Sequence, residues 1–313
     1  MALPRASEVA ARRVDAEPRG KRVVVAIPCL NEERNIGSLV IQAKRWASEV
    51  IVIDDGSADE TGLVAEAAGA IVIRHETNQG KGAALNSAFA VALGRDADVL
   101  VVMDGDGQHR AVEIPVVAGP IISGEADISV GSRHLREAEG EIPKVRRVGQ
   151  TVVTTATNLG SGVALTDSQS GFRAFSRRAL EVMTFSSSGF AVESEMQFLA
   201  LDQNLRVVEV PIEAVYRDPP KRNVVRHGLV VLDGLMRLVG MHRPLLFFAV
   251  AALIAWTVGS VLALVALEAI DRGSATAAMG PTLGAAACLL LGVLSVFAGV
   301  ILHSVRTMML HLR

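Results

Sequence analysis

The segment Asp98-Val-Leu-Val-Val-Met-Asp-Gly-Asp-Gly-Gln-His109 is the stretch around which the rest of the chain is arranged. Its apolar run, from Val99 to Met103, has the length and the β-branched content of a buried strand. The run ends in Asp104 and Asp106, two carboxylates separated by a glycine. Buried carboxylates need a compensating cation, and oxygen ligands suit Mg²⁺ or Mn²⁺. The segment therefore predicts a divalent-metal site at a strand end.

An ordinary loop is the alternative interpretation, because Asp and Gly are common turn residues. The segment by itself favours neither interpretation. An EF-hand calcium loop is excluded, since its sixth position would be His109 where glycine is needed and its twelfth would be Pro115 where glutamate is needed.

The length and composition set the limits of the fold. With 313 residues the chain can form one large α/β domain and an additional segment. Its net charge of −2 gives no sign of nucleic-acid binding. The two cysteines, Cys29 and Cys288, are predicted to be reduced packing residues. Residues 1–21 are polar and rich in arginine, and we interpret them as a basic, mobile N-terminal arm.

Strand and helix patterns alternate from Arg22 onward, which predicts a mainly parallel sheet with helices on both faces. Ligands of such sheets bind beyond the carboxyl ends of the strands. The polar clusters that follow predicted strands should therefore share one edge of the sheet. They occupy residues 28–32, 54–57, 78–82 and 104–108.

The polar clusters also carry a family resemblance. Six motifs occur in order: Pro28-Cys-Leu-Asn-Glu32, Asp54-Asp-Gly-Ser57, Asn78-Gln-Gly-Lys-Gly82, Asp104-Gly-Asp-Gly-Gln-His109, Gly131-Ser-Arg133 and Ser170-Gly-Phe-Arg173. The set resembles the family 2 glycosyltransferases, which implies a GT-A fold, a Rossmann-like mixed sheet, over residues 22–222. The last two motifs look most like the polyprenyl-phosphate branch, which includes dolichol-phosphate mannose and glucose synthases and undecaprenyl-phosphate glucosyltransferases.

The resemblance implies that the earlier motifs bind a nucleotide sugar and its metal ion. Asp54 and Asp55 match an acidic pair near the base and ribose. Asp104, Asp106 and Gln108 match the ligands of Mg²⁺ or Mn²⁺ at the donor diphosphate. The implied donor-binding residues are Pro28, Leu30, Asn31, Glu32, Asp54, Asp55, Gly56, Asn78, Lys81, Gly82, Asp104, Gly105, Asp106 and, in a basic loop that closes over the diphosphate, Arg217.

The later motifs imply a site for an acceptor phosphate. Arg133 matches an arginine at this phosphate, and Arg146 or Arg147 matches a second one. Guanidinium suits the role, because it binds phosphate bidentately and keeps its charge. The implied acceptor residues are Arg133, Arg146, Arg147, Ser170, Arg173, Lys221 and Arg222. The implied catalytic residues are Asp104, Asp106, Arg133 and Asp167.

Two acidic positions and the C-terminal end complete the pattern. Glu193 and Glu195 lie in a predicted helix, where they form a solvated face or one of them points into the cleft; the solvated face is slightly favoured. Residues 223–243 are amphipathic at helical period, which predicts a helix in the membrane interface.

Residues 244–313 predict two transmembrane helices, at about 244–267 and 281–302, because both stretches are uncharged and long enough to cross a bilayer. Their many small residues suit close helix packing. Basic residues on both sides of this hairpin predict that the catalytic domain and both termini are cytoplasmic. They are Lys221, Arg222, Arg226, Arg237, Arg243, Arg306 and Arg313.

Together with the predicted anchor, the resemblance implies an integral membrane enzyme of the cytoplasmic or an ER-equivalent membrane, an inverting glycosyltransferase. It would move one sugar from a nucleotide sugar, of the UDP-glucose or GDP-mannose type, to a dolichyl or undecaprenyl phosphate. A homo-oligomer is compatible with the sequence. One alternative is a tethered glycosyltransferase with a soluble or polysaccharide acceptor. An alternative of another class is a non-catalytic nucleotide-sugar sensor or scaffold.

Overall fold

The computed structural model describes residues 20–135, 151–186 except 152, 156 and 159, 192–213, and 236–311 except 237, 238, 241 and 242. The chain divides into two compact units, Met1–Leu235 and Met236–Arg313, which we describe separately. Residues 1–19 of the predicted arm and most of the predicted interfacial helix at 223–243 lie outside the described residues.

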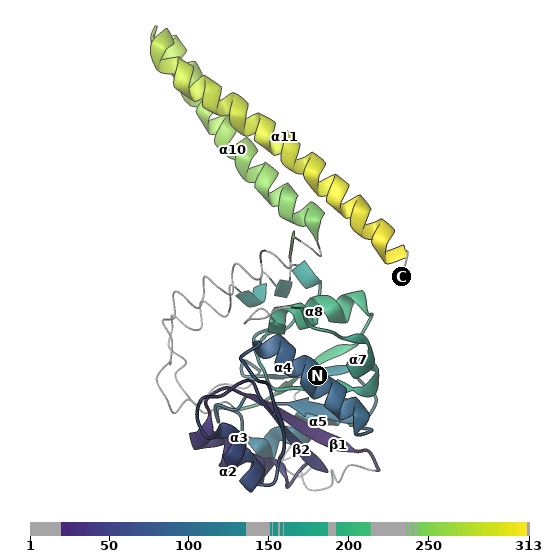
Figure 1. Cartoon of the computed structure of the whole chain (residues 1–313). Coiled ribbons are helices and arrows are strands. Elements are labelled where there is room, and N and C mark those ends of the chain that lie inside the picture. Colours follow the sequence, from purple (N-terminus) through teal and green to yellow (C-terminus); the bar gives the residue numbers. More distant parts are fainter. Residues whose placement is uncertain are drawn as a thin grey trace. The chain divides into compact units, whose positions relative to one another are not determined.

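The first unit contains a seven-stranded sheet in the order β3-β2-β1-β4-β6-β5-β7 (Figure 1). All neighbouring strands pair in parallel except at β6, which is antiparallel to both β4 and β5. The strands are β1 (Val23–Cys29), β2 (Glu49–Asp54), β3 (Ile71–Arg74), β4 (Val99–Val102), β5 (Ile128–Ser132), β6 (Arg173–Ser176) and β7 (Val207–Pro211). The predicted mixed and mainly parallel sheet is therefore confirmed.

Helices cover both faces of this sheet and bury an apolar core on each (Figure 1). One face packs against α2 (Glu33–Ala43), α3 (Thr61–Ala67), the 3₁₀ turn η1 (Ala111–Glu113) and α5 (Ile114–Ile122). The other face packs against α4 (Lys81–Gly94), α7 (Arg177–Val182) and α8 (Val192–Asp202). Strands β1, β2 and β4 are buried on both faces, which explains why their sequences are nearly continuous apolar runs.

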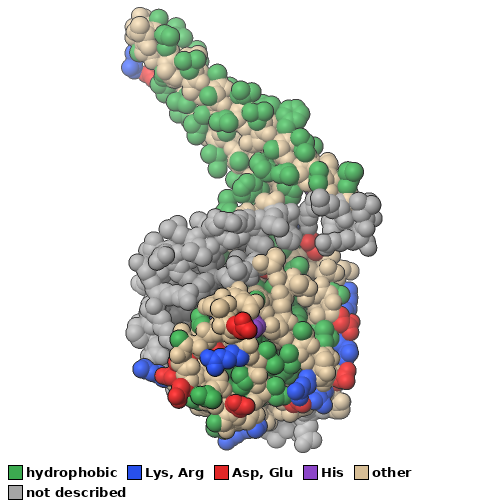
Figure 2. Space-filling model, in the orientation of Figure 1, with side chains coloured by type: hydrophobic (Ala, Val, Ile, Leu, Met, Phe, Trp, Pro, Cys, Tyr) green, Lys and Arg blue, Asp and Glu red, His purple; other side chains and the backbone are tan. Residues whose placement is uncertain are grey.

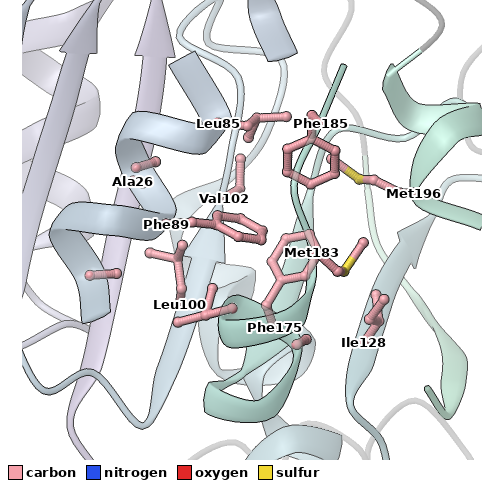
Figure 3. Close-up of a cluster of buried hydrophobic side chains, with 14 of the residues drawn as sticks. Ala26, Leu85, Phe89, Leu100, Val102, Ile128, Phe175, Met183, Phe185 and Met196 are labelled. Atoms are coloured by element: carbon pink, nitrogen blue, oxygen red, sulfur yellow. The ribbon is translucent and has the colours of Figure 1, made fainter. Parts of the chain in front are cut away.

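Three phenylalanines join the helices to the sheet in the second core (Figure 3). Phe89 of α4 meets Phe175 of β6 and Phe185 edge to face, with ring centroids 4.9 and 5.2 Å apart. Such pairs add stability beyond the apolar area that they bury. They fix α4, and with it the residues at its amino end, over the centre of the sheet.

The second unit is a pair of apolar helices, α10 (Pro244–Asp271) and α11 (Ala275–His311). Both are long and apolar enough to cross a membrane. Hydrophobic side chains cover nearly the whole visible length of the pair (Figure 2). The second helix continues through Pro281, where the sequence predicted the span to begin. The pair therefore has the length and surface of a membrane anchor.

Small residues line the contact between these two helices at seven-residue intervals. They are Ala252, Gly259 and Ala266 on α10, and Ala278, Ala285, Gly292 and Gly299 on α11. An added Cβ at Gly259 would lie 3.1 Å from Cys288 Cβ, and one at Gly292 would collide with the Trp256 indole. Close backbone approach of this kind holds helices together in lipid, where burial of apolar surface gives no driving force between them.

We expect Gly259→Cys to form a disulfide with Cys288 on mild oxidation, because the added Cβ lies close enough to bridge the two helices. Adding Gly292→Leu should abolish most of this cross-link, since the larger side chain forces the Trp256 region of α10 away. The measurement is thiol alkylation of membranes in a Cys29→Ser background, with Leu264→Ala, an exposed position on α10, as the matched control. Equal cross-linking in all variants would contradict this packing.

Candidate active site

One edge of the sheet collects the predicted site residues that the structure describes. Since β6 runs opposite to its neighbours, its amino end lies beside the carboxyl ends of the other strands. The polar segments that leave or enter the sheet at this edge are 28–32, 54–57, 78–82, 104–108, 131–133 and 167–173. Motifs spread over about half of the chain are thereby brought to one place.

The turn after β4 is shaped by its packing against β1. A Cβ on Gly105 would lie only 2.6 Å from Cys29 Sγ, so a larger residue would push the turn off the sheet. The Gln108 backbone N–H donates to Asp106 Oδ1 at 3.0 Å. Burial, followed by the nearby carboxylates, raises the pKa of the Cys29 thiol well above its usual value. Cys29 is therefore a neutral packing residue here, and both cysteines are free, as predicted.

His109 supports the same turn through a hydrogen bond to its backbone. The Asp104 backbone N–H donates to His109 Nδ1 at 3.3 Å. The buried imidazole stacks on Phe172, with ring centroids 5.1 Å apart. Burial lowers the pKa of His109 in spite of the neighbouring aspartates, which agrees with a neutral ring that accepts this bond.

The two aspartates have different electrostatic surroundings. Burial alone would raise the pKa of Asp104, but the charge of Lys81 outweighs it and lowers this pKa to about 2. Burial and then the charge of Asp104 raise the pKa of Asp106. A divalent cation would relieve that repulsion.

This pair of carboxylates fits Mg²⁺ or Mn²⁺. In the part of the chain that the structure describes, no group of three or more His, Cys, Asp and Glu is placed to hold a metal. Mg²⁺ is typically bound by one or two carboxylates, with substrate phosphates and water in its other positions. Asp104 and Asp106 can supply the protein's share, and the half-buried Gln108 lies next to them in the chain.

Lys81, at the start of α4, lies between two carboxylates. Its Nζ is 2.6 Å from Asp104 Oδ1 and 2.7 Å from Glu193 Oε1. Glu193 and Glu195 are only 5% and 3% exposed, so the prediction of a solvated face for them was wrong. The physical reason is that α8 packs on the sheet with its acidic side chains turned to donors, Lys81 for Glu193 and Ser186 for Glu195.

The acidic pair after β2 holds neighbouring loops. Asp55 accepts the backbone N–H groups of Gln79 and Gly80, at 3.0 and 2.8 Å, and its Oδ1 is 2.7 Å from the His75 ring. Asp54 accepts the N–H of Ser57 at 2.9 Å. Both aspartates are buried, and Asp54 Oδ2 also lies 3.5 Å from Arg74 Nε at the end of β3. Their role at a donor base or ribose remains a prediction.

The segment after β1 is tied to the loop after β2. The Asn31 N–H donates to Ser57 Oγ, and the Ala58 N–H donates to Asn31 Oδ1, both at 2.9 Å. The Glu32 N–H donates to Thr61 Oγ1 at 2.8 Å. Pro28, Leu30 and Glu32 are half-buried at this edge, where they can line a binding site.

Arg133, which follows β5, is held by a bidentate ion pair. Its Nε and one terminal nitrogen donate to the two oxygens of Asp167, at 2.6 and 2.8 Å. Asp167 is fully buried, and Arg133 lowers its pKa against the opposing effect of burial. Glu209 of β7 accepts the N–H groups of Thr166 and Asp167, at 2.7 and 2.9 Å. Glu209 thus holds the backbone at Asp167, and the Asp167 carboxylate in turn positions the Arg133 guanidinium.

Arg173 lies deeper than the resemblance implied. Its side chain is 1% exposed, and it donates to the backbone oxygens of Ser170 and Ser168, at 2.8 and 2.6 Å. Ser170 is also fully buried. The contacts described for Arg173 are therefore those of a residue that shapes the 168–172 loop. The other expected arginines and lysine at the acceptor and donor phosphates lie outside the described residues: Arg146, Arg147, Arg217, Lys221 and Arg222.

Two residues of this network, His75 and Glu209, escaped the sequence prediction, and a third, Glu193, was singled out but favoured for a solvated face. Glu209 had a signal that could have found it, because it interrupts the apolar run Val-Val-Glu-Val-Pro of β7. Glu193 resembled an ordinary surface acid of a helix. His75 directly follows β3 and belongs to none of the recognised motifs.

Comparison with known proteins agrees with this arrangement. Residues 24–184 match the model of the family described as glycosyl transferase family 2. The UDP-N-acetylglucosamine–dolichyl-phosphate N-acetylglucosaminyltransferase of Methanococcus voltae is 32% identical, over 63% of this chain and 87% of its own. The polyprenol monophosphomannose synthase of Mycolicibacterium smegmatis is also 32% identical, over 63% of this chain and 79% of its own.

A solved structure shares the fold. Glucosyl-3-phosphoglycerate synthase from Mycobacterium tuberculosis, in complex with Mn²⁺, UDP-glucose and phosphoglyceric acid, superposes with a TM-score of 0.56. It is 24% identical, and the match covers 77% of this chain and 86% of that one. At this identity the likeness extends to the fold alone.

Proposed function

The chain belongs to glycosyl transferase family 2, and from this premise we propose that it moves one sugar from a nucleotide sugar to the phosphate of a polyprenyl phosphate. One observation carries the proposal: Arg133 follows β5 and Asp104 follows β4, and both strands pair with β6, so an arginine suited to a phosphate and the acidic pair lie at the same edge of the sheet. The relatives that use dolichyl phosphate and polyprenol support a lipid acceptor. The apolar helix pair supplies a reason for it, because a polyprenyl tail stays in the bilayer.

The chain's own residues would act by positioning. Arg133 would bind the acceptor phosphate, and Asp167 and Glu209 would hold the guanidinium in place. One phosphate oxygen would attack the anomeric carbon as the bond to the nucleoside diphosphate breaks, which inverts the configuration. Asp104 and Asp106 would hold Mg²⁺ or Mn²⁺, and the bound ion would offset charge on the leaving diphosphate. Alignment of the two phosphates is the main contribution of such a site.

The deciding experiment is an assay of the purified full chain in detergent with a panel of nucleotide sugars. Transfer should appear with undecaprenyl or dolichyl phosphate and be absent without it, for one nucleotide sugar above the others. Transfer to a soluble or polysaccharide acceptor without lipid phosphate would replace this proposal by the tethered-enzyme alternative. Nucleotide-sugar binding without transfer to any acceptor would favour a sensor.

We further propose that the active-site edge and both termini face the cytoplasm. The basic residues on either side of the hairpin support this orientation. Single cysteines placed at Gly273 and after Arg313, in a Cys29→Ser/Cys288→Ser background, should be labelled from opposite sides of the membrane by an impermeant maleimide. Labelling of both positions from the same side would refute the hairpin.

A further inference from the structure

Lys81 is the cation that the structure places against the predicted metal ligands. Its Nζ contacts Asp104 Oδ1 at 2.6 Å and Glu193 Oε1 at 2.7 Å. An ammonium group has three N–H donors, and these two ion pairs use two of them. The third can reach a further oxygen ligand, such as that of a phosphate, without loss of either carboxylate.

Asp104 has little room for a second cation while Lys81 holds it. Its Oδ1 is taken by the ammonium, and its Oδ2 faces the backbone of Gly171 so closely that an added Cβ there would collide with the carboxylate. The Asp104 side chain is 29% exposed, so a divalent ion can approach it from solvent. Such an ion would meet the Lys81 charge at short range, and like charges in a partly buried site repel strongly.

Glu193 provides the second anchor for this ammonium. Its side chain is 6% exposed, so its ion pair with Lys81 is largely shielded from water. A buried carboxylate is costly to leave without its cationic partner. The Lys81 side chain can therefore give up Asp104 and remain paired at Glu193.

We propose that Lys81 and the divalent cation compete for Asp104, and that Glu193 is a positioning residue which draws the ammonium toward itself and so favours metal binding. The inference rests on the metal site of the proposed function. In this proposal the Lys81 ammonium has two positions, one paired with Asp104 and one paired with Glu193. Pairing to Asp104 opposes the metal, whereas pairing to Glu193 leaves an N–H donor for the donor diphosphate.

The proposal predicts opposite effects of two neutral substitutions on metal affinity. Lys81→Met removes the competing charge, so Mn²⁺ should bind about tenfold more tightly in the absence of nucleotide. Glu193→Gln leaves Asp104 as the only carboxylate for Lys81, so Mn²⁺ should bind about fivefold to tenfold more weakly. A role of Glu193 in folding alone would not change Mn²⁺ affinity in this pattern.

The test is Mn²⁺ binding to the purified full chain in detergent, followed by electron paramagnetic resonance of the free ion. The double variant Lys81→Met/Glu193→Gln separates two explanations of the glutamate effect. If Glu193 acts through Lys81, then Glu193→Gln should change Mn²⁺ affinity less than twofold once Lys81 is Met. If its charge attracts the ion directly, the two effects add and the proposal is overturned.

Glu195→Gln is the matched control, because Glu195 is equally buried on the same helix and binds Ser186. It should leave Mn²⁺ affinity within about twofold of wild type, since the partner described for it is Ser186 and not Lys81. If wild type binds no Mn²⁺ with or without UDP, both the metal site and this inference fail. If wild type binds Mn²⁺ but Lys81→Met binds it no more tightly, this inference alone fails.

Discussion

Asp106→Ala is expected to reduce sugar transfer below detection while the domain stays folded. Asp106 is half-buried, and the bond described for its side chain is one from the Gln108 backbone N–H. Burial and the charge of Asp104 raise its pKa, so its folded-state pKa lies above the unfolded value. The ionised Asp106 carboxylate therefore destabilises the folded state at neutral pH. This destabilisation grows as the pH rises from the unfolded-state pKa to the folded-state pKa. Removal of Asp106 should leave the melting temperature unchanged or slightly higher.

The activity should fall for a separate reason, because Asp104 alone cannot hold the divalent ion well. The measurement is transfer of labelled sugar to polyprenyl phosphate, together with thermal unfolding in detergent. Asp96→Ala is the matched control, since Asp96 is 86% exposed and follows α4 at the opposite edge of the sheet. Full activity of Asp106→Ala, or of wild type in excess chelator, would refute the metal assignment.

The fold was predictable because its signals are local and repeated. Each buried strand is a short apolar run, and each ends in a polar cluster such as Asp54–Ser57 or Asp104–Gln108. Parallel strands then oblige these clusters to meet at one edge. A short strand through Phe175 was predictable, but the antiparallel direction of β6 has no local signal and becomes evident only in its pairing with β4 and β5.

The contacts inside the site were less predictable, because they join residues far apart in sequence. Lys81 and Glu193 are separated by 112 positions, and nothing at either position marks the pairing. Arg173 was expected at an acceptor phosphate, but its guanidinium is used to hold the backbone of its own loop. Residue type alone cannot separate an arginine that binds a ligand from one that binds carbonyl groups, since both roles use the same donors.

Arg133→Ala is expected to lose transfer to polyprenyl phosphate by a hundredfold or more, about 3 kcal/mol of transition-state stabilisation, with little change in nucleotide affinity. Part of any loss could come from instability, because the substitution leaves Asp167 buried without its bidentate partner. The double variant Arg133→Ala/Asp167→Ala removes both charges and should unfold at a higher temperature than Arg133→Ala. It should not recover transfer, since no guanidinium is left for the phosphate.

Arg133→Lys should recover transfer only in part, because an ammonium lacks the planar fork that pairs with Asp167. Calorimetry of UDP or GDP binding to each variant is the check. A loss of nucleotide affinity as large as the loss of transfer would place Arg133 at the donor instead of the acceptor.

Asp167→Asn should lose far less transfer activity than Arg133→Ala, and the ionisation state of Asp167 explains why. Arg133 lowers the pKa of Asp167 below its ordinary range near 4. This carboxylate is therefore already ionised near neutral pH and does not change its protonation state there. A carboxylate held in that state is a weak base. The acceptor phosphate has a second pKa of about 6 and is mostly a dianion at pH 7, so it needs no base.

The rate of wild type and of Asp167→Asn should therefore fall together as the pH drops through about 6, where the phosphate dianion gains a proton. The Asn variant should keep about a tenth or more of the activity, because it retains one oxygen for Arg133 and loses the charge. Initial rates between pH 5 and 8.5 measure both quantities. A loss of about a thousandfold that shrinks as the pH rises would make Asp167 the general base. The Arg133–Asp167 pair would then transfer a proton in addition to positioning a phosphate.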